Sequence, residues 1–389
     1  MTDRPLSTLI TDAHSGGGGQ VRYVLNLARE LTRLGHSVTL GCRPNSVLAD
    51  EARATGCEVC DRLALRGGLR PRAWLTDTAF VAGFLREHRP DVVHVSGSQD
   101  HWTCAAANRL LGRPAALVRT RHNTYAVGRG VANRLLNRVW TDRQIVVCRL
   151  VRDDLAEHPA FDASRLTTIH NGVDADLFRP DPTVRARMRA EFGYAEDHVV
   201  VGIAARLVPA KGHTYLFDAV QRISDPRLRV LTLGTGPLES ALREETRARG
   251  IGDRVLFAGF RDDMAACVQA VDIGVQPSVD CDTSSFSLKE QMACEKPVIA
   301  SDYGGLPEIV DDGVEGVVVA AGDARALEQA IRALLADAEL RVRMGKAGRA
   351  RVLREFTVEV FARRTVAAYR EAIAWHQSRR QGGAPQGTG

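Results

Sequence analysis

The chain has 389 residues, of which 44% are hydrophobic, and its formal net charge is +5. This length and composition suffice for two globular domains, or one unusually large one, with buried cores. No apolar run approaches the ~20 residues that a membrane-spanning helix needs, and charged residues and four glycines stand where a signal peptide would be apolar. We therefore expect a cytoplasmic protein.

The first half predicts strands that alternate with helices. A strand at 7–11 leads through a glycine turn into a helix, in which apolar residues recur at helical spacing from Val21 to Leu34. Further strands are predicted at 37–40, 92–95, 116–118 and 145–147, and further helices at 75–86 and 105–111. This alternation is typical of a parallel sheet covered by helices.

The second half repeats the pattern. Its predicted strands lie at 199–204, 230–233, 255–257, 273–276 and 298–300, and a long helix follows at about 358–378. We expect an α/β protein with two doubly wound domains, 1–178 and 179–378, whose last helix can pack back on the first domain. The Gly- and Gln-rich tail 379–389 is predicted to be disordered. Ligands of such sheets bind beyond the carboxyl ends of the strands, which predicts a site in a cleft.

Positive charge is concentrated in the first half. Residues 1–180 hold 24 Arg, no Lys and 18 acidic residues, which gives +6 and leaves −1 for the rest. This surface could face nucleic acid, an anionic membrane or a phosphorylated acceptor, or it could be solvated without a special role. A basic amphipathic helix is one candidate for membrane contact; its residues are Arg129, Val131, Arg134, Leu135, Leu136, Arg138, Val139, Trp140 and Arg143.

A glycine run follows the first predicted strand. Residues 16–19 are all glycine and a helix begins at once, so backbone N–H groups and a helix N-terminus point toward one space, which suits a diphosphate. A flexible turn is the alternative interpretation. The run lacks the G-x-G-x-x-G spacing and the downstream acid of a nicotinamide site, which disfavours a dehydrogenase.

Two cations and two acids of the second half are further candidates. Arg206 and Lys211 follow the first strand of that half and could converge on one phosphate, although a solvated basic turn is the alternative. Asp282 and Glu290 stand before and within a predicted helix, so both can face the cleft. Because carboxylates accept hydrogen bonds from vicinal hydroxyls, we expect one acid on a sugar and the other on a ribose.

The cysteines predict no metal site. Eight are scattered along the chain, and the one close pair, Cys57 and Cys60, has no second pair or histidine cluster to complete a zinc site. Asp-rich metal motifs are also missing from the sequence. Reduced, structural thiols are the expected state.

These segments, in this order, resemble glycosyltransferase family 4, whose members have the GT-B fold and retain the configuration of the transferred sugar. The resemblance spans nearly the whole chain and rests on a co-linear set of motifs. They include Gly17-Gly18, Leu34-Gly35-His36, Asp91-Val92-Val93-His94, Thr120-Arg121-His122, Asn171-Gly172-Val173-Asp174, Leu233-Gly234, Gly259-Phe260 and Gly304-Gly305-Leu306-Pro307-Glu308.

The resemblance implies roles for single residues. Arg206 and Lys211 would bind the donor diphosphate, and Glu290 would bind the ribose. Asp282 would lie beside the donor sugar, with His122 near that sugar from the first domain. Other residues expected near the donor are Gly17, Gly18, Gly234, Gly259, Phe260, Phe286, Ser287 and Leu288. Core packing of Phe286 and a structural role for His122 are the alternatives.

Three departures from the family pattern limit this transfer. Asp282 is one methylene shorter than the usual Glu, which leaves the donor sugar unidentified. Residues 283–285, Thr-Ser-Ser, replace Gly-aromatic-Gly and offer hydroxyl donors for phosphate. Ser96 stands where many members have a second histidine, so His94 is given no catalytic role.

The implied activity is retaining glycosyl transfer (EC 2.4.-.-) from a nucleotide sugar, UDP- or GDP-linked, without metal or other cofactor. The expected acceptor is a glycan or a lipid-linked molecule in cell-envelope polysaccharide or lipopolysaccharide synthesis. We expect no nucleic-acid partner and a cytoplasmic enzyme that can rest on the inner face of the plasma membrane. The alternatives are a nucleotide-sugar 2-epimerase of the same fold and a non-catalytic nucleotide-binding partner.

Overall fold

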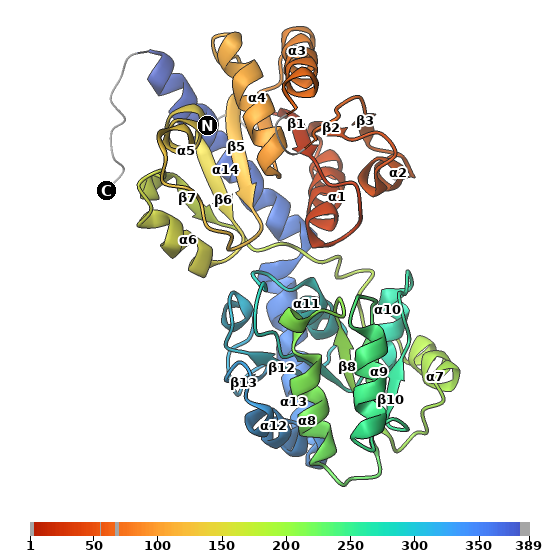
Figure 1. Cartoon of the computed structure of the whole chain (residues 1–389). Coiled ribbons are helices and arrows are strands. Elements are labelled where there is room, and N and C mark those ends of the chain that lie inside the picture. Colours follow the sequence, from red (N-terminus) through yellow and green to blue (C-terminus); the bar gives the residue numbers. More distant parts are fainter. Residues whose placement is uncertain (1–3, 55, 67–69, 382–389) are drawn as a thin grey trace. The chain divides into compact units, whose positions relative to one another are not determined.

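The computed structural model describes residues 4–54, 56–66 and 70–381. The chain divides into two compact α/β units: residues 1–172 with 358–389 form unit 1, and residues 173–357 form unit 2 (Figure 1). The first boundary differs from the predicted one at 178, because Val173, Ala175 and Phe178 pack in a core of unit 2. The second boundary lies at 357 rather than 378, because the last helix belongs to unit 1, which agrees with the expectation that it can pack back on the first domain.

Unit 1 contains a seven-stranded sheet in the order β3-β2-β1-β4-β5-β6-β7, with parallel pairing throughout. The strands are β1 (Ser7–Asp12), β2 (Ser37–Cys42), β3 (Glu58–Cys60), β4 (Val92–Val95), β5 (Ala116–Arg121), β6 (Arg143–Val146) and β7 (Leu166–Thr168). The strand order reverses between β1 and β4, and a ligand crevice is expected where it does.

The helices of unit 1 connect these strands and cover the sheet. They are α1 (Gly19–Arg33), α2 (Val47–Ala54), α3 (Pro71–His88), α4 (Ser98–Leu110), α5 (Val131–Arg134), the π-helical turn η1 (Leu135–Trp140), α6 (Arg149–Ala156), the 3-10 turn η2 (Ala163–Arg165) and α14 (Val358–Arg380). The last of these, α14, packs against α1, β5 and β6.

The predicted disordered tail begins too early. Arg379 and Arg380, its first two residues, are the last turn of α14. Residues 382–389 lie outside the described part of the chain.

Unit 2 contains a six-stranded sheet in the order β10-β9-β8-β11-β12-β13, again with parallel pairing. The strands are β8 (Val199–Ala204), β9 (Leu228–Leu233), β10 (Val255–Phe257), β11 (Ile273–Gln276), β12 (Val298–Ser301) and β13 (Gly316–Val319). The order reverses between β8 and β11, so the two strands that carry the predicted cations and the first predicted acid are neighbours.

The connections of unit 2 are mostly helical. They are α7 (Pro182–Glu191), η3 (Pro209–Lys211), α8 (His213–Gln221), α9 (Glu239–Ala248), α10 (Met264–Cys267), η4 (Val268–Ala270), α11 (Phe286–Ala293), η5 (Leu306–Glu308), α12 (Ala324–Ala336), α13 (Ala338–Arg351) and the π-helical turn η6 (Val352–Phe356).

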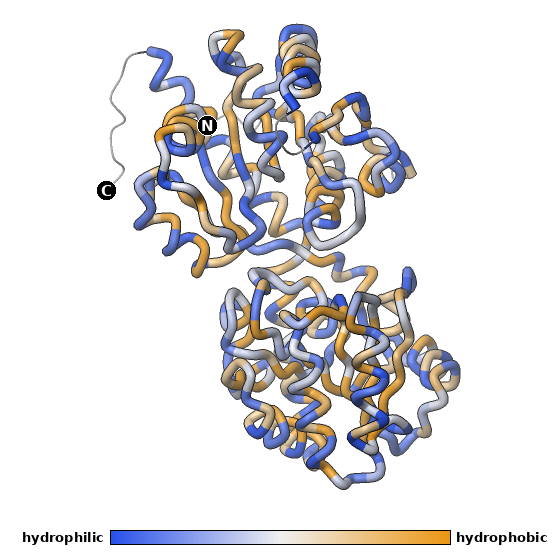
Figure 2. Tube along the Cα trace, in the orientation of Figure 1, coloured by the Kyte–Doolittle hydropathy of each residue, from blue (hydrophilic) through white to orange (hydrophobic). Residues whose placement is uncertain are grey.

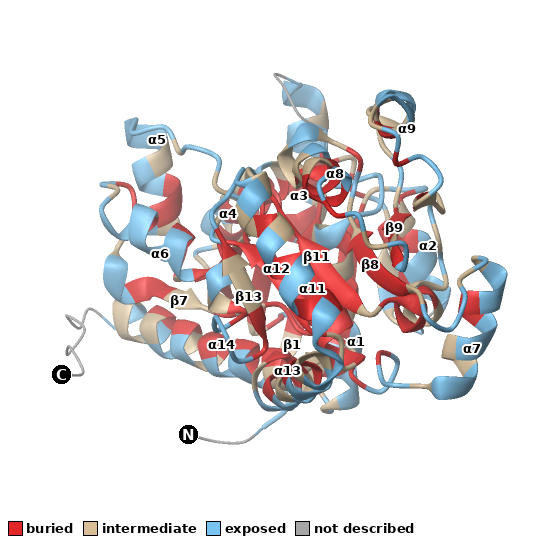
Figure 3. Ribbon diagram, turned by 90° about the horizontal axis from the view of Figure 1, so that it is seen from below, coloured by how far each residue is buried: buried red, intermediate tan, exposed pale blue. Residues whose placement is uncertain are grey.

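The sheet of unit 2 is buried on both faces. Along β8, Val199 and Val201 pack with α8, α9 and α12 in one core, whereas Val200 packs with α7 and α10 in another. Successive side chains of a strand point to opposite faces, so a continuous apolar run is what a sheet between two helical layers requires. Figure 2 shows these strands as hydrophobic, and Figure 3 shows β8 and β11 as largely buried beside a mostly exposed α7.

Two sequence predictions need correction. Three strands, β3, β7 and β13, were not predicted, and each is a short strand at an edge of its sheet. The basic helix is shorter than predicted: its helical part ends at Trp140, and Arg143 lies in β6. There Arg143 forms an ion pair of 2.8 Å with Glu371 of α14, so it is not part of a basic helical face.

Within the described residues, no helix is both long and apolar enough to cross a membrane. All eight cysteines are reduced thiols, and five of them are buried.

Candidate active site

The reversal of strand order between β8 and β11 in unit 2 brings together two residues to which the sequence assigned separate tasks. Lys211, the last residue of η3, donates from Nζ to Oδ2 of Asp282 at 3.0 Å. Both side chains are mostly buried, with 20% and 7% of their surface exposed. The lysine expected on a diphosphate thus already neutralises the carboxylate expected beside the donor sugar.

Asp282 is held by two further residues that the sequence analysis missed. Its Oδ2 also accepts hydrogen bonds from Nε2 of Gln276 and from Oγ of Ser278, each at 2.8 Å. Gln276 is the last residue of β11, and its Nε2 also donates to Ser278 Oγ at 2.9 Å. Polar residues at the carboxyl end of a predicted strand were the available signal, because that end faces the crevice.

Glycines let the loops of the crevice approach one another. A Cβ at Gly212 would overlap the carbonyl oxygen of Pro277, and a Cβ at Gly304 would overlap that of Asp282. Both glycines have positive φ, at 72° and 63°, a region that favours glycine. Gly305 N–H donates to the same Asp282 carbonyl at 3.1 Å, so the loop after β12 fixes the backbone beneath the carboxylate.

Gly234 plays the same part on the other side of β8. Its φ is 129°, and a Cβ there would overlap the carbonyl oxygen of Ala205. Its N–H donates to the carbonyl of Gly259 at 2.7 Å, and Leu207 N–H donates to Thr235 at 3.0 Å. Gly234 and Gly259 therefore shape the backbone around Arg206 and contribute no side chain.

Helix α11 places the second acid. Ser285 caps the helix, since its Oγ accepts from Leu288 N at 3.2 Å. Leu288 packs fully in a core with Phe286 against it, which matches the packing alternative for Phe286. The Leu288 N–H is thus already used by the cap, and the phosphate contacts expected of the Phe286 and Ser287 backbone stay predictions. Glu290, one helical turn on, is 2% exposed.

Two predicted donor residues are open to solvent. Arg206 is exposed in the turn between β8 and η3. Phe260 follows β10 with 77% of its surface exposed. An exposed aromatic side chain beyond a strand end remains a candidate for stacking on a base.

Lys289 is a buried charge that sequence analysis did not single out. It is fully buried, its Nζ donates to Ser284 Oγ at 2.9 Å, and it lies 5.0 Å from the ring centre of Phe356. Ser284 stands where the family commonly has an aromatic residue, and here its oxygen accepts from this lysine. The hydroxyls of Ser284 and Ser285 therefore both accept hydrogen bonds from residues of α11.

Unit 1 places His122 directly after β5. Its ring meets Tyr23 of α1 edge-on at 4.6 Å, and burial lowers the pKa of His122 to about 3, so the ring is neutral at physiological pH. His94 is structural: it is fully buried, with Nδ1 2.6 Å from the Tyr369 hydroxyl and Nε2 2.7 Å from that of Thr120. It ties β4 to β5 and to α14.

The predicted glycine loop precedes α1. Gly18, with φ at 139°, is the residue before the helix, and both Gly17 and Gly18 are exposed. Gln20 fixes the start of the helix by donating to Asp12 Oδ2 at 2.7 Å and to the carbonyl of Ser96 at 3.2 Å. The loop is therefore anchored at its end and open at its tip.

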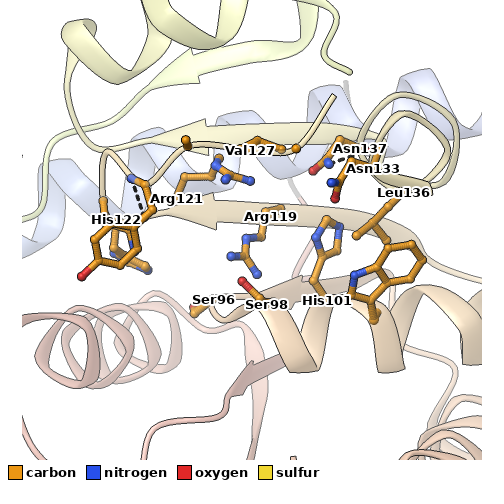
Figure 4. Close-up of a pocket in the computed structure, with 15 residues that line it drawn as sticks. Ser96, Ser98, His101, Arg119, Arg121, His122, Val127, Asn133, Leu136 and Asn137 are labelled. Carbon is orange, nitrogen blue, oxygen red and sulfur yellow. Dashed lines mark hydrogen bonds between the residues drawn. The ribbon is translucent and has the colours of Figure 1, made fainter. Parts of the chain in front are cut away.

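A pocket of about 250 Å³ lies at the carboxyl end of β5 in unit 1. Figure 4 shows two arginines of that strand, Arg119 and Arg121, among its lining residues, with Arg119 pointing toward Ser98 at the start of α4. His122 also lines it. No sequence motif pointed to Arg119; alternate arginines at a strand's carboxyl end were the available signal.

Metal ligands are not gathered anywhere in the described residues: no group of three or more His, Cys, Asp or Glu side chains is placed to hold an ion.

Two family models cover most of the chain. Residues 17–177 match the model described as Glycosyltransferase Family 4, and residues 184–351 match that of Glycosyl transferases group 1.

Curated relatives agree with these matches. A D-inositol 3-phosphate glycosyltransferase of Mycobacteroides abscessus is 33% identical over 80% of this chain and 76% of its own length. Another of that name, from Xylanimonas cellulosilytica, is 30% identical over 86% and 87%. A GDP-mannose-dependent mannosyltransferase of Mycolicibacterium smegmatis is 35% identical over 56% and 60%.

Solved structures share the whole fold. A glycosyltransferase of Rickettsia africae superposes with a TM-score of 0.86 at 19% identity, over 95% of this chain and 99% of its own. Anabaena HepE in complex with UDP gives 0.82 at 21% identity, over 93% and 99%. The fold is thus GT-B, and the chain belongs to the group 1, family 4 glycosyltransferases.

Proposed function

We propose that this glycosyltransferase moves a sugar from UDP or GDP to a glycan or lipid-linked acceptor, with retention of configuration and without a metal ion. We place the reaction in the synthesis of cell-envelope polysaccharide or lipopolysaccharide. The observation that carries the proposal is the pair Lys211–Asp282, held at the reversal point between β8 and β11 beside the start of α11.

The site residues divide the work in the proposed reaction. Lys211 and Arg206 neutralise the diphosphate as it leaves, which is electrostatic work suited to fixed cations. The N-terminus of α11, which begins at Phe286, adds the positive end of a helix dipole on the same side. Glu290 holds the ribose hydroxyls and Asp282 a hydroxyl of the sugar.

The proposed step needs no general base from the chain. The bond between the anomeric carbon and the phosphate oxygen breaks, and the acceptor oxygen bonds to that carbon on the same face. The departing phosphate oxygen takes the acceptor proton. We propose that the neutral ring of His122 forms a hydrogen bond with the sugar.

Similar proteins support the choice of substrates. The HepE structures contain UDP, glucose or UDP-glucose, and the mannosyltransferase relative is described as GDP-mannose-dependent. Several relatives are named for D-inositol 3-phosphate, a phosphorylated molecule, and a structural neighbour is named as a lipopolysaccharide outer core galactosyltransferase.

We propose that the helical segment α5–η1 rests on an anionic membrane. Val131, Leu135 and Val139 are exposed at 83%, 37% and 38%, and they follow one another at four-residue spacing on one helical stripe. Arg134 and Arg138 flank this stripe and are exposed as well. An apolar stripe between arginines suits the boundary between lipid headgroups and acyl chains.

Flotation with vesicles rich in anionic lipid tests this contact. The protein should float at low salt, and Val131→Asp together with Leu135→Asp should abolish flotation. If the variant floats as well as the natural protein, or if the natural protein does not float, the proposed membrane contact is wrong.

A thermal-shift panel of UDP, GDP, ADP and their sugar conjugates tests the donor site. A ligand at about 100 times its Kd adds about 2.7 kcal/mol, which raises Tm by a few degrees. We expect one nucleotide to stabilise the natural protein and not Glu290→Ala. The control Glu339→Ala, at an exposed position of α13, should respond like the natural protein. No shift with any nucleotide would contradict the proposed function.

A further inference from the structure

The pocket at the end of β5 contains a buried cation without a hydrogen-bonded counter-ion. Arg119 is only 6% exposed, and its Nε and Nη1 have no hydrogen-bond partner among the described residues. Buried N–H donors are nearly always paired, and burying a guanidinium without a partner is costly. A ligand that brings acceptor oxygens would remove this cost.

The nearby acids do not satisfy Arg119. Asp100 and Asp12 are the acidic groups whose charge favours its protonated form. Asp100 Oδ2 instead accepts from Thr11 Oγ1 and from the N–H groups of Ser96 and Gly97, at 2.9–3.0 Å. Burial also raises the pKa of Asp100, which weakens its compensating charge.

Asp100 Oδ1 has no hydrogen-bond partner among the described residues and forms no ion pair with Arg119, whereas both oxygens of Asp12 are engaged by other residues. Its Oδ1 lies 2.9 Å from Nδ1 of His14, and its Oδ2 accepts from Gln20. No ion pair of 4.0 Å or less joins Arg119 or Arg121 to a carboxylate in the described part of the chain.

A second arginine of the same strand adds to the positive charge. Arg121 lies two residues on, so both side chains point to the same face of the sheet. Burial, followed by the charge of Arg119, lowers the pKa of Arg121 to about 9. Two cations that repel each other at one pocket favour a ligand with more than one negative charge.

The rest of the lining suits a sugar or polyol. Ser96 Oγ is buried and has no partner among the described residues, and Asn123 and Asn133 supply amides. Trp102 offers an aromatic side chain. His101 adds no charge, because burial lowers its pKa well below its usual value. A pocket of about 250 Å³ has room for a single small polar group rather than a large ligand.

We propose that this pocket binds a phosphomonoester of the acceptor, with Arg119 and Arg121 as its phosphate-binding residues. The guanidinium fork matches phosphate oxygens in pairs, and a phosphomonoester carries close to two charges at neutral pH. This assignment rests on the proposed transferase function, because it makes the phosphate a handle that positions an acceptor hydroxyl. With the phosphate bound by Arg119 and Arg121, residues of unit 1 select the acceptor.

Inorganic phosphate is the probe, titrated calorimetrically at constant ionic strength against acetate. The titration uses Lys211→Ala, so that the cations of unit 2 contribute little. Phosphate should bind more tightly than acetate, and Arg119→Gln or Arg121→Gln should weaken it about tenfold or more. Arg109→Gln, an exposed arginine of α4 with the same loss of charge, should leave the Kd unchanged.

Three results would overturn the assignment: no phosphate binding, equal Kd values for phosphate and acetate, or equal loss in Arg109→Gln and Arg119→Gln. The nucleotide panel run on Arg119→Gln separates this failure from that of the proposed function. A nucleotide shift that persists while phosphate binding is lost supports both sites. A persisting nucleotide shift with no phosphate effect overturns only the pocket assignment.

Discussion

The cation beside the sheet of unit 2 is paired with a carboxylate, whereas a buried cation in the sheet of unit 1 is not. In unit 2, Lys211 is paired with Asp282, whose carboxylate is also held by Gln276 and Ser278. In unit 1, Arg119 is buried more deeply than Lys211 and has unpaired donors. The first site is preorganised by its own residues, whereas the second presents buried donors that no described residue satisfies.

This difference in pairing predicts a different effect of a bound anion at each site. A diphosphate that enters the unit 2 crevice must share Lys211 with Asp282, so Asp282 keeps the lysine in place before the donor arrives. An anion that enters the unit 1 pocket relieves the repulsion between Arg119 and Arg121. Donor binding should therefore depend on the position in which Asp282 holds Lys211, and acceptor binding on the negative charge of the ligand that reaches Arg119 and Arg121.

The largest expected effect comes from Lys211→Ala. Removing a fixed cation from a leaving group costs about 10²–10³ in turnover by analogy with lost transition-state donors. Initial rates of sugar transfer, with circular dichroism as a check of folding, measure it. Lys346→Ala, which removes an exposed lysine of α13, should keep its activity. Near-natural turnover of Lys211→Ala would show that the diphosphate does not lie at β8.

A backbone change in the same crevice should act on stability. Gly212→Ala forces a Cβ onto the Pro277 carbonyl at a positive φ, so we expect a loss of about 1–3 kcal/mol. Urea unfolding measures the free energy. Gly16→Ala, where a Cβ meets nothing within 4 Å, should change stability little. Equal losses in both variants would contradict the close packing of these loops.

Acid should destabilise unit 1 through its buried histidines. Burial lowers the pKa of His94 to about 3, so the unfolded chain binds a proton between pH 6.5 and 3 that the folded chain does not. Stability is therefore complete above pH 6.5 and falls as pH decreases, by roughly 1–2 kcal/mol per such histidine at pH 5. Urea unfolding at pH 7 and at pH 5 measures how far the free energy of unfolding falls with pH. The His94→Gln variant should show a smaller fall. An unchanged slope in that variant would exclude His94 as a source.

The smallest expected effect comes from removing the charge of Arg119. Arg119→Met removes an unpaired buried charge while keeping apolar bulk, so we expect the ligand-free protein to gain about 1 kcal/mol. Asp282→Ala in unit 2 should instead lose stability, because Lys211 loses its partner. Differential scanning calorimetry of both variants compares them. A loss in Arg119→Met would mean that Arg119 serves the fold through Asp100.

Most of the fold follows from periodicity in the sequence. Val92–Val95, Val199–Ala204 and Ile273–Gln276 are strands with the predicted bounds, because buried parallel strands are continuous apolar runs. The edge strands β3 and β7, with three residues each, carry too short a pattern to be recognised. Pairing with a neighbour defines such strands, and pairing is not local information.

The candidate site was predictable as a set of positions and less so as contacts. The order of motifs placed Lys211 and Asp282 at one crevice, but their ion pair depends on how two loops meet over Gly212 and Gly304. The partnership of Lys289 with Ser284 also depends on helix packing. The sequence did not identify Arg119 as a site residue, because no motif marks an arginine in a strand. Only the burial of its side chain makes it unusual.

Release of nucleotide from the stabilising sugar donor, followed by chromatography, tests the central claim most directly. The natural protein should release nucleotide slowly without acceptor and faster with a phosphorylated acceptor, whereas Glu290→Ala should release almost none. Donor binding without any release, or equal release by Glu290→Ala, would contradict a glycosyltransferase site built on α11.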